Sequence, residues 1–431
     1  STRTRASWNI RRLSRNHECR AVDRPRHRCP YGRRPRVVDP PRGAKNLEYR
    51  RWVLASGYAK RHVDLLNERC RAAPLFYINT FVWQYNPNTI GTNSLEVGPF
   101  VTWPFQDDAI RVILECMKDR KDLVIEKSRE LGASWMCGLI CDWHFLFVPN
   151  KKFLMISRNE EAVDRRGDSD SLFAKLDFVH RRLPEWLGNV EGIERRKMLF
   201  ENPRIETAIT GQASTGKAGV GGRAFAMFID EFPQIEEDYE VFHRTSDTSG
   251  CRIFNGTHKG TNTCFYELTH GKLAKHYRKL HLHWSQHPDK CRGLYRFNAK
   301  DNKDEVLEKT YDFPADFVFR RTGLPAGGPF PGLRSPWYDE QCDRKGDTRA
   351  VAMDLDMDPQ GSVSQFFDAM TIYRMIEEFA CDPYWEGDVV CERDSGKLLR
   401  LVKRKGGLLR LWTHLRMGEL PVESSYVGGV D

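Results

Sequence analysis

The sequence predicts an α/β protein whose core has three layers, with a mostly parallel sheet between two layers of helices. Between residues 101 and 290, short apolar runs without polar alternation are separated by stretches with helical spacing. Strands that are apolar on both faces are buried between helices, and parallel neighbours need a crossover connection that is usually helical. A helical and irregular segment precedes this core, and a linker region follows it.

The expected strands and helices of the core alternate along the chain, as a parallel sheet requires. We expect strands at the apolar runs 122–127, 151–157, 204–210, 224–231 and 251–257. We expect helices at 133–147, at the charged stretch 159–183, and from about Glu236 onward.

Residues 46–100 and 291–420 flank the core. The first region begins with helical spacing and continues into the aromatic run 74–87, and we expect a lid or adaptor segment there. The second region contains Pro/Gly stretches, one expected helix around 366–380 and β-like runs within 388–415, and we expect a lid or linker subdomain.

The first 45 residues carry most of the positive charge. Residues 1–45 contain 14 Lys and Arg against 3 Asp and Glu, whereas the whole chain has a formal net charge of +9, so the remainder is slightly acidic. This stretch is rich in Arg and Pro and has no apolar period, which is typical of disordered segments. We expect either a tail that binds phosphate backbones non-specifically or a dispensable extension.

The composition argues against several classes of protein. The 12 cysteines include no C-x-x-C pair, which disfavours a disulfide or zinc framework, and Cys137 and Cys141 are expected in the core. The sequence has no run of about 18 apolar residues and no signal-peptide pattern. We therefore expect a cytosolic protein with no membrane segment.

The stretch "EKSRELGASW", residues 126–135, is close to a phosphate-binding loop. An expected strand leads into a turn at Gly132 and then into a helix, whose first N–H groups and positive dipole end would face an anion. Ser134 stands where the loop motif places a magnesium-binding hydroxyl. Ala133 stands where the motif has lysine, so Lys127 or Arg129 would have to supply the cation. An ordinary strand-to-helix turn is the alternative.

The stretch "AFAMFIDE" ends an expected strand in Asp230 and Glu231. A carboxylate at this position holds the magnesium shell in nucleotide hydrolases, and a second one polarises the attacking water. An apolar strand that ends in two acids is common. This motif therefore supports a nucleotide site only in combination with the phosphate-binding loop at 126–135. Together they predict a P-loop NTPase core that binds ATP and Mg²⁺.

Four further residues complete the expected site. Arg223 lies in a Gly-rich loop before the acidic strand and would reach a γ-phosphate, more plausibly that of a neighbouring subunit; a solvated loop arginine is the alternative. Asn255 and Thr257 lie at the end of another expected strand. Their side chains would sense the γ-phosphate; a cap at the start of a helix is the alternative. Gln106 lies upstream of the loop, and its side-chain amide has a donor and an acceptor that match those of adenine. A surface residue without a ligand is the alternative.

The stretches "PFQ", "EKSRELGASW", "AMFIDEF" and "FNGTHKG" occur in an order and spacing that resembles the ATPase half of the large terminase subunit of tailed bacteriophages, the DNA-packaging motor. The segments "FYINTFVWQYNP" and "DLDMDPQGSVSQFF" resemble parts of one branch of that family. The resemblance covers about residues 60–431. Phosphate loops in this family can carry the basic residue early in the loop.

The resemblance implies roles for the residues of the pattern. The implied nucleotide-binding residues are Gln106, Lys127, Arg129, Gly132, Ala133, Ser134 and Asp230. The implied catalytic residues are Glu231, the coupling residue Thr257 and the trans-acting finger Arg223. Ser134 and Asp230 would hold Mg²⁺ together with the nucleotide.

The resemblance also implies partners and a second activity. It implies a homo-oligomeric ring on a procapsid in the host cytoplasm, acting on double-stranded DNA with a portal protein and a small terminase subunit. Residues 421–431 resemble the first strand of a ribonuclease-H-type nuclease, and Asp431 its first metal ligand. Because one carboxylate does not hold a two-metal site, we expect the chain as given to lack nuclease activity.

Two other functions stay open at this point. A helicase-like DNA-dependent ATPase would also end a strand in Asp-Glu, but it needs a second motor domain, which residues 300–431 do not suggest. A non-enzymatic DNA- or capsid-binding remnant would explain Ala133.

His281, His283 and His287 are expected to be structural, because no cysteine or acid stands at ligand spacing beside them.

Overall fold

The computed structural model describes residues 39–43, 45–55, 61–85, 97–188, 190, 192–214, 222–298, 303–320, 330, 332–361, 378, 381–391 and 398–412. Nearly all of the basic tail, all but one residue of the helix expected around 366–380, and the final run 421–431 lie outside these residues. Among the described residues, no helix is both long and apolar enough to cross a membrane.

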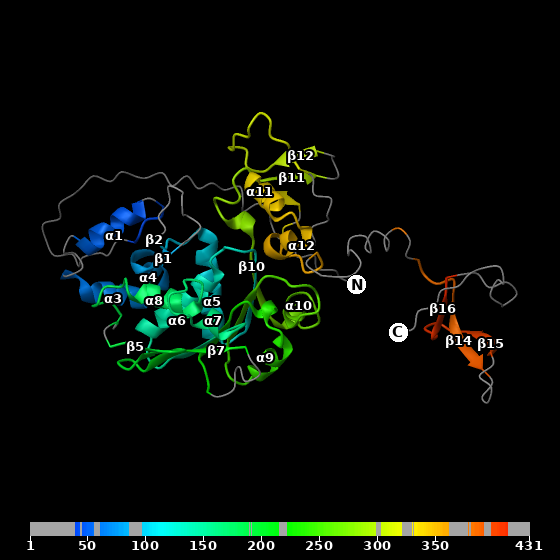
Figure 1. The fold of residues 1–431 in the computed structure, drawn as a ribbon, viewed down its shortest axis with the longest axis horizontal. Helices are drawn as coiled ribbons and strands as arrows, with labels where there is room; N and C mark the ends of the chain where they lie inside the picture. Colours follow the sequence, from blue (N-terminus) through cyan, green and yellow to red (C-terminus); the bar gives the residue numbers. More distant parts are fainter. Residues whose placement is uncertain are drawn as a thin grey trace. The chain divides into compact units, whose positions relative to one another are not determined.

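The core is built on an eight-stranded sheet with the order β10-β3-β9-β8-β4-β7-β6-β5. Figure 1 labels β10, β7 and β5 of this sheet. Its strands are β3 (Leu123–Lys127), β4 (Lys152–Ser157), β5 (Glu194–Arg196), β6 (Leu199–Asn202), β7 (Thr207–Ala213), β8 (Ala226–Ile229), β9 (Arg252–Gly256) and β10 (Arg278–Leu282). The six strands from β10 to β7 pair in parallel, whereas β5 and β6 pair antiparallel at one edge. Strand β9 thus lies between β3 and β8, so the carboxyl ends of these three strands meet at one edge of the sheet.

Helices cover both faces of this sheet. The helices of the core are α5 (Pro104–Asp119), α6 (Ala133–Phe147), α7 (Glu160–Val163), α8 (Leu172–His180), α9 (Asp238–Arg244) and α10 (Cys264–Thr269). Val124, Met227 and Phe254 of the strands pack with Phe265 and Leu268 of α10 in one buried cluster. On the other face, α6 contacts β7, α5 and α8. The expected three-layer α/β core with a mostly parallel sheet is therefore confirmed.

Most expected elements agree with the structure to within a few residues. The helix expected at 133–147 is α6, with the same bounds. The charged stretch 159–183 forms two helices, α7 and α8, rather than one, because the Ser171 hydroxyl accepts from the Ala174 amide and starts α8 there. The antiparallel strands β5 and β6 were not expected.

Smaller elements flank the core. On the N-terminal side they are α1 (Lys45–Ala55), α3 (Val63–Ala72), α4 (Pro74–Phe81) and the antiparallel pair β1 (Trp83–Tyr85) and β2 (Val97–Pro99). On the C-terminal side they are β11 (Tyr295–Asn298), β12 (Lys303–Val306), β13 (Leu333–Arg334), α11 (Pro336–Lys345), α12 (Thr348–Val351), β14 (Trp385–Cys391), β15 (Leu398–Lys403) and β16 (Leu409–Leu411). These last strands form two antiparallel three-stranded sheets. The described residues beyond β10 therefore contain no second parallel sheet.

Candidate nucleotide site

The turn between β3 and α6 has the backbone shape that its sequence predicts. Gly132 precedes α6 with a φ of +77°, a left-handed conformation that favours glycine. A Cβ at this position would lie 2.9 Å from the Gln106 side-chain nitrogen, so that amide would have to shift to admit a side chain. No side chain of the described residues caps α6. The first amides of this fifteen-residue helix are therefore free of a side-chain acceptor and suit an anion.

The rest of the loop is held from behind by residues far away in the sequence. The Arg129 amide donates to the Asp354 carbonyl at 2.7 Å, and the Ser128 hydroxyl donates to the Leu355 carbonyl at 2.5 Å. The Lys290 ammonium donates to the carbonyls of Arg129 and Glu130 at 3.2 and 3.3 Å. The loop is thus fixed before any ligand binds, which lowers the ordering cost of binding.

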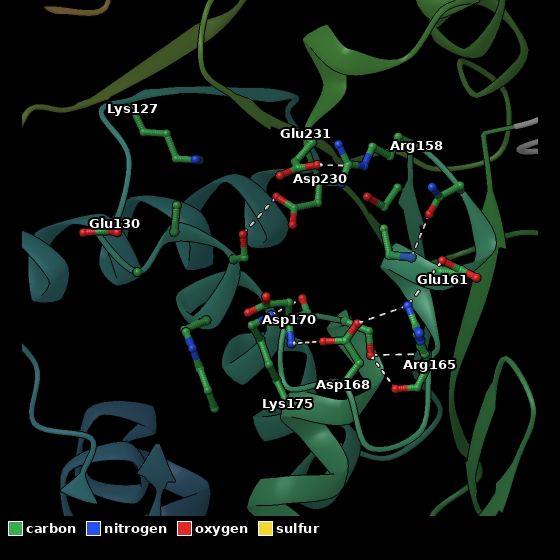
Figure 2. Close-up of a pocket in the computed structure, with 18 of the residues that line it drawn as sticks. Lys127, Glu130, Arg158, Glu161, Arg165, Asp168, Asp170, Lys175, Asp230 and Glu231 are labelled. Atoms are coloured by element: carbon green, nitrogen blue, oxygen red, sulfur yellow. Dashed lines mark hydrogen bonds and ion pairs between the residues drawn. The ribbon is translucent and has the colours of Figure 1, made fainter. Parts of the chain in front are cut away.

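A cavity of about 500 Å³ opens at the start of α6 (Figure 2). Its lining carries both signs of charge. The charged lining residues are Lys127, Glu130, Arg158, Glu161, Arg165, Asp168, Asp170, Lys175, Asp230 and Glu231. Gly132, Ala133, Ser134 and Trp135 supply the helix start. The cavity therefore combines an anion-binding helix terminus, several cations and a pair of adjacent carboxylates.

Asp230, just after β8, lies at the centre of a polar cluster that joins it to helix α6 and strand β9. The Ser134 hydroxyl donates to Asp230 Oδ1 at 3.0 Å, and Asn255 Nδ2 donates to the same oxygen at 2.5 Å. Asp230 and Asn255 are buried. Hydroxyl and carboxylate oxygens are the ligands that Mg²⁺ prefers, so the Ser134 and Asp230 oxygens fit a magnesium site.

Glu231 turns its carboxylate out of the strand and into the cavity. Its φ is +50°, which is uncommon for a residue with a side chain and typical of strained functional turns. Glu231 Oε2 lies 3.4 Å from Arg158 Nε, and the Glu231 side chain is 43% exposed, so solvent reaches it. Figure 2 shows this pair at one end of the cavity, on the same side as Asp230.

Lys127 and Arg129, the two candidate cations, have different surroundings. Lys127 lines the cavity, and Figure 2 shows its side chain pointing toward the side where Asp230 and Glu231 lie. Burial lowers the pKa of the Lys127 ammonium, and the charges of Asp230 and Glu231 partly offset this. Arg129 is not among the lining residues; its Nε pairs with Asp354 Oδ1 at 2.8 Å, and its side chain is 58% exposed.

The structure gives Gln106 a role in the protein rather than at the cavity. Its side-chain oxygen accepts from the Trp103 amide at 3.0 Å, and its side-chain nitrogen donates to the Leu131 carbonyl at 3.1 Å. Gln106 is buried and is absent from the cavity lining. It caps α5 and braces the loop, and reading adenine would require its amide to exchange both partners.

Arg223 and Thr257 lie outside the cavity lining. Arg223 precedes β8, whereas Glu231 follows it, so the two residues belong to opposite edges of the sheet. Within one chain, β8 thus separates Arg223 from Glu231. The expected action of Arg223 on a neighbouring subunit stays a prediction. Thr257 is buried just after β9, beside Asn255, which makes the actual contact with Asp230. Asp431 lies outside the described residues.

Arg158 and Lys175 line the cavity but were missed by sequence reasoning. Arg158 directly follows β4, so its place at the carboxyl end of a parallel strand was the available signal. Lys175 lies within α8, where no local pattern distinguishes it from a solvated residue. Burial lowers the pKa of the Lys175 ammonium, and the Asp230 charge opposes that shift.

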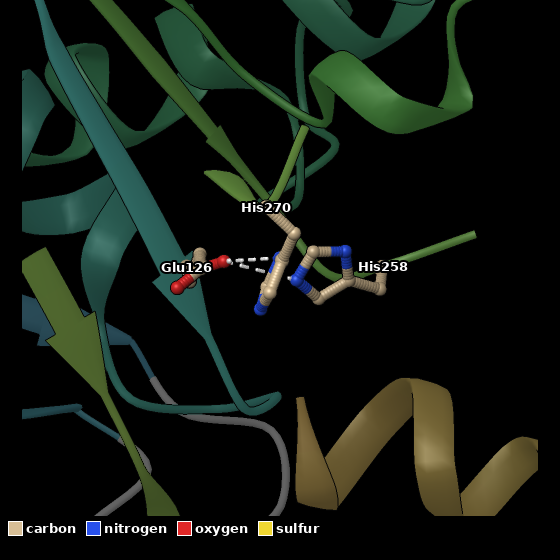
Figure 3. A group of neighbouring side chains, drawn as sticks. All are labelled: Glu126, His258 and His270. Carbon is tan, nitrogen blue, oxygen red and sulfur yellow. Dashed lines mark hydrogen bonds and ion pairs between the residues drawn. The ribbon is translucent and has the colours of Figure 1, made fainter. Parts of the chain in front are cut away.

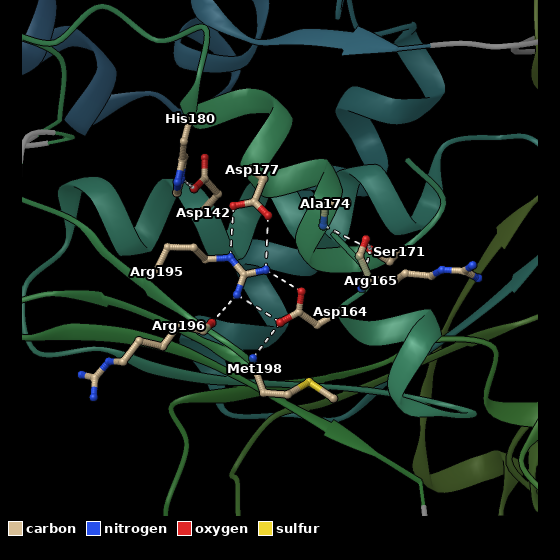
Figure 4. A network of polar contacts seen from close by, with 10 residues as sticks. All are labelled: Asp142, Asp164, Arg165, Ser171, Ala174, Asp177, His180, Arg195, Arg196 and Met198. Atoms are coloured by element: carbon tan, nitrogen blue, oxygen red, sulfur yellow. Dashed lines mark hydrogen bonds and ion pairs between the residues drawn. The ribbon is translucent and has the colours of Figure 1, made fainter. Parts of the chain in front are cut away.

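The wall formed by residues 164–171 is anchored by Arg195 (Figure 4). The Arg195 guanidinium donates to both Asp164 oxygens, at 3.0 and 2.5 Å, and to Asp177 Oδ1 at 3.1 Å. Burial would raise the pKa of Asp164, but the bond from Arg195 lowers it below its usual range. The charged wall of the cavity is thereby held in place.

The three histidines at 281–287 do not converge. His283 is buried, its pKa is lowered to about 3 by burial, and its ring contacts Ser285. His287 packs against Trp103. His281 faces Glu126 instead.

Comparison with known proteins gives matches among solved structures. No family model and no curated protein sequence matches the chain. The chain is similar to large terminases of bacteriophages. The HK97 large terminase has 15% identity and a TM-score of 0.40 over 77% of this chain and 66% of that one.

Two further matches cover smaller parts of the chain. The large terminase of a thermophilic bacteriophage, in complex with ATP-gamma-S, has 14% identity and a TM-score of 0.33, over 43% of this chain and 46% of that one. The large terminase ATPase domain of Thermus phage P74-26 has 14% identity and a TM-score of 0.31, over 39% of this chain and 79% of that one. The match to the ATP-gamma-S complex thus spans less than half of that terminase.

Proposed function

We propose that this chain is an ATP-hydrolysing motor subunit that moves double-stranded viral DNA into a procapsid, in the manner of a large terminase subunit. One observation carries the hydrolase part of the proposal. The free start of α6, Lys127 and the pair Asp230–Glu231 line one cavity, although they come from separate strands and helices. A phosphate site next to two carboxylates is the arrangement that nucleotide hydrolysis needs.

Each residue has a role that its position supports. The α6 amides and the Lys127 ammonium bind the β- and γ-phosphates of ATP. Ser134 and Asp230 hold Mg²⁺, which neutralises phosphate charge when bound. The Glu231 carboxylate lies in the cavity and is accessible to solvent. It takes the proton of the attacking water as a general base. Arg158, paired with Glu231, is placed to stabilise charge on the γ-phosphate.

Between the two candidate cations, the geometry supports Lys127. Lys127 lines the cavity, whereas the Arg129 guanidinium is engaged by Asp354. A cation that already borders the cavity binds phosphate without first breaking an ion pair. We therefore assign the phosphate contact to Lys127 and a loop-bracing role to Arg129.

Asn255 supports a route from the nucleotide to the rest of the motor. Its amide contacts Asp230, and Thr257 follows it two residues later at the end of β9. A shift of the Asp230 carboxylate on nucleotide binding would pass through the Asn255 contact to the segment after β9. This is the coupling role that the resemblance gives to Thr257.

The DNA-packaging part of the proposal rests on the order and spacing of the four sequence motifs. It includes a homo-oligomeric ring at the procapsid in the host cytoplasm, with Arg223 acting on the neighbouring subunit, and a portal protein and a small terminase subunit as partners. Contacts to DNA would be made to phosphates, so DNA binding should be nearly independent of sequence and should weaken with salt.

The test is the ATP turnover of the full chain with and without double-stranded DNA. We expect DNA to stimulate turnover, and Glu231→Gln to lower it by about a hundredfold or more. Glu236→Gln is the matched control, because Glu236 is exposed and is not among the lining residues. Full turnover in Glu231→Gln would overturn the proposal. Separation of the strands of a forked duplex would favour the helicase alternative.

A further inference from the structure

A cluster of one carboxylate and three imidazoles lies behind the phosphate loop, outside the nucleotide cavity (Figure 3 shows three of its members). Glu126 lies on β3, His258 follows β9 by two residues, His270 follows α10 by one, and His281 lies on β10. In the parallel pairing of β10 with β3, His281 is directly opposite Glu126, so their side chains share a face of the sheet. Strand β3 and the stretch from His258 to His281 thus place their polar groups together.

The distances within this cluster are close to those between ligands of one metal ion. Glu126 Oε1 lies 3.2 Å from His258 Nε2 and 3.4 Å from His270 Nδ1, and the three ligand atoms lie within 4.8 Å of one another. Ligand atoms around a tetrahedral zinc ion lie about 3.3 Å apart, given metal–ligand distances of about 2.0–2.1 Å. Charge-assisted hydrogen bonds are usually shorter, at about 2.7–2.9 Å.

The surroundings suit an ion held by few ligands. The side chains of Glu126 and His258 are 1% exposed, whereas those of His270 and His281 are 31% and 34% exposed. The cluster is therefore buried on one side and reachable on the other. His281 Nδ1 lies 2.5 Å from Glu126 Oε2, the oxygen that faces away from the other two rings. A group in this position orients a ligating carboxylate.

The chemistry of the cluster also suits a cation, because it brings a carboxylate oxygen and imidazole nitrogens together. Imidazole nitrogens select zinc and similar transition metals over magnesium and calcium.

We propose that Glu126, His258 and His270 form a binding site for a divalent transition metal ion of the zinc class, with His281 positioning the carboxylate. The site is separate from the magnesium site at Ser134 and Asp230 and does not depend on the proposed ATPase. Its ion would join the end of β3, just before Lys127, to the segment that follows Asn255 and Thr257. It would therefore fix the loop that holds the phosphates relative to the strand that contacts Asp230.

A hydrogen-bonded network without metal is the competing explanation. The Thr269 hydroxyl lies 2.9 Å from His270 Nδ1, and a carboxylate can accept several hydrogen bonds. The two explanations differ in one measurable respect, which is the uptake of an ion. The experiment below separates them.

The experiment uses the full chain, freed of metal with a chelator and then titrated with Co²⁺ and Zn²⁺. We expect Co²⁺ to give the visible absorption of a tetrahedral site, Zn²⁺ to displace it, and Zn²⁺ to raise the melting temperature. His270→Asn should lose the Co²⁺ absorption and the stabilisation, and His281→Asn should weaken binding by about 10–100-fold. His276→Asn, which removes an exposed histidine six residues after His270, should bind as the parent chain does.

Circular dichroism of the variants shows whether they are folded. Because the His270 side chain is partly exposed, we expect His270→Asn to fold. Three outcomes would overturn the proposal. These are no ion uptake by the parent chain, unchanged uptake by folded His270→Asn, or thiolate-to-cobalt absorption bands that place the ion on cysteines.

Discussion

The Ser134 hydroxyl donates a hydrogen bond of 3.0 Å to the Asp230 carboxylate across a separation of 96 residues in the chain. The two residues follow β3 and β8, which are not neighbours, and β9 lies between them. Asn255 of β9 fills the gap and donates to the same Asp230 oxygen. The carboxyl edge of three strands is thus drawn together at one carboxylate.

This contact predicts that Ser134→Ala raises the magnesium concentration that nucleotide binding requires. The variant removes one hard oxygen ligand, so the Mg²⁺ concentration for half-maximal ATP binding should rise about tenfold, which corresponds to about 1.4 kcal/mol. The measurement is a Mg²⁺ titration at fixed ATP. Ser246→Ala, at an exposed position, is the control. An unchanged Mg²⁺ requirement would argue against a magnesium role for Ser134.

Lys127→Met and Arg129→Met should differ in their effect on nucleotide affinity. Lys127 borders the cavity and Arg129 pairs with Asp354, so we expect a loss of at least about tenfold for the first and much less for the second. Titration calorimetry with a slowly hydrolysed ATP analogue measures both. A larger loss for Arg129→Met would identify Arg129 as the phosphate cation.

Arg158→Gln should lower kcat more than it raises KM. The guanidinium lies 3.4 Å from Glu231 and would contact the γ-phosphate mainly as charge develops there, so we expect kcat to fall at least about tenfold. Steady-state ATPase kinetics measure the two constants. Arg196→Gln removes an exposed arginine that does not line the cavity and should leave both constants unchanged. If kcat of Arg158→Gln equals that of the parent chain, Arg158 has a structural role and no role in catalysis.

Arg223 should act only between subunits. Because Arg223 and Glu231 lie at opposite ends of β8, an arginine finger here must reach the site of a neighbour. Arg223→Ala and Glu231→Gln should each be inactive, and mixing the two proteins should restore part of the activity, since some interfaces pair an intact Arg223 with an intact Glu231. Mixtures that stay inactive at every ratio would contradict this assignment.

The buried His283 should make the protein less stable in acid. Burial lowers its pKa from 6.5 to about 3, so between these values the unfolded chain binds a proton that the folded chain does not. The free energy of unfolding should therefore fall as pH drops through this window, by up to about 1.4 kcal/mol per pH unit from this group. Urea unfolding at several pH values measures the slope. His283→Asn should make it shallower, and an unchanged slope would exclude His283 as a cause.

The sequence allowed the fold class to be predicted, together with the places in the fold of the glycine turn and of the two acids. The α6 helix has the expected bounds, and Gly132, Ser134, Asp230 and Glu231 stand where strand and helix ends were expected. These predictions depend on local periodicity and on the rule that parallel strands share a carboxyl edge. The division of 159–183 into two helices was not predicted, because the cap at Ser171 competes locally with continuation of the helix.

Contacts between segments far apart in the chain could not be predicted in the same way. Local sequence patterns do not reveal that Arg129 forms an ion pair with Asp354, or that Arg158 forms one with Glu231. They also do not reveal that the Gln106 side-chain amide forms hydrogen bonds with backbone groups. Each of these contacts depends on how elements from separate parts of the chain pack.

The sequence by itself therefore determined the alternation of strands and helices, the glycine turn before α6 and the two acids after β8, since each follows from neighbouring residues. Only the tertiary structure decided that Lys127 rather than Arg129 borders the cavity. It also decided that Glu126 lies beside His258, His270 and His281. The physical reason is that these contacts depend on strand order and register, and packing across the whole sheet fixes both.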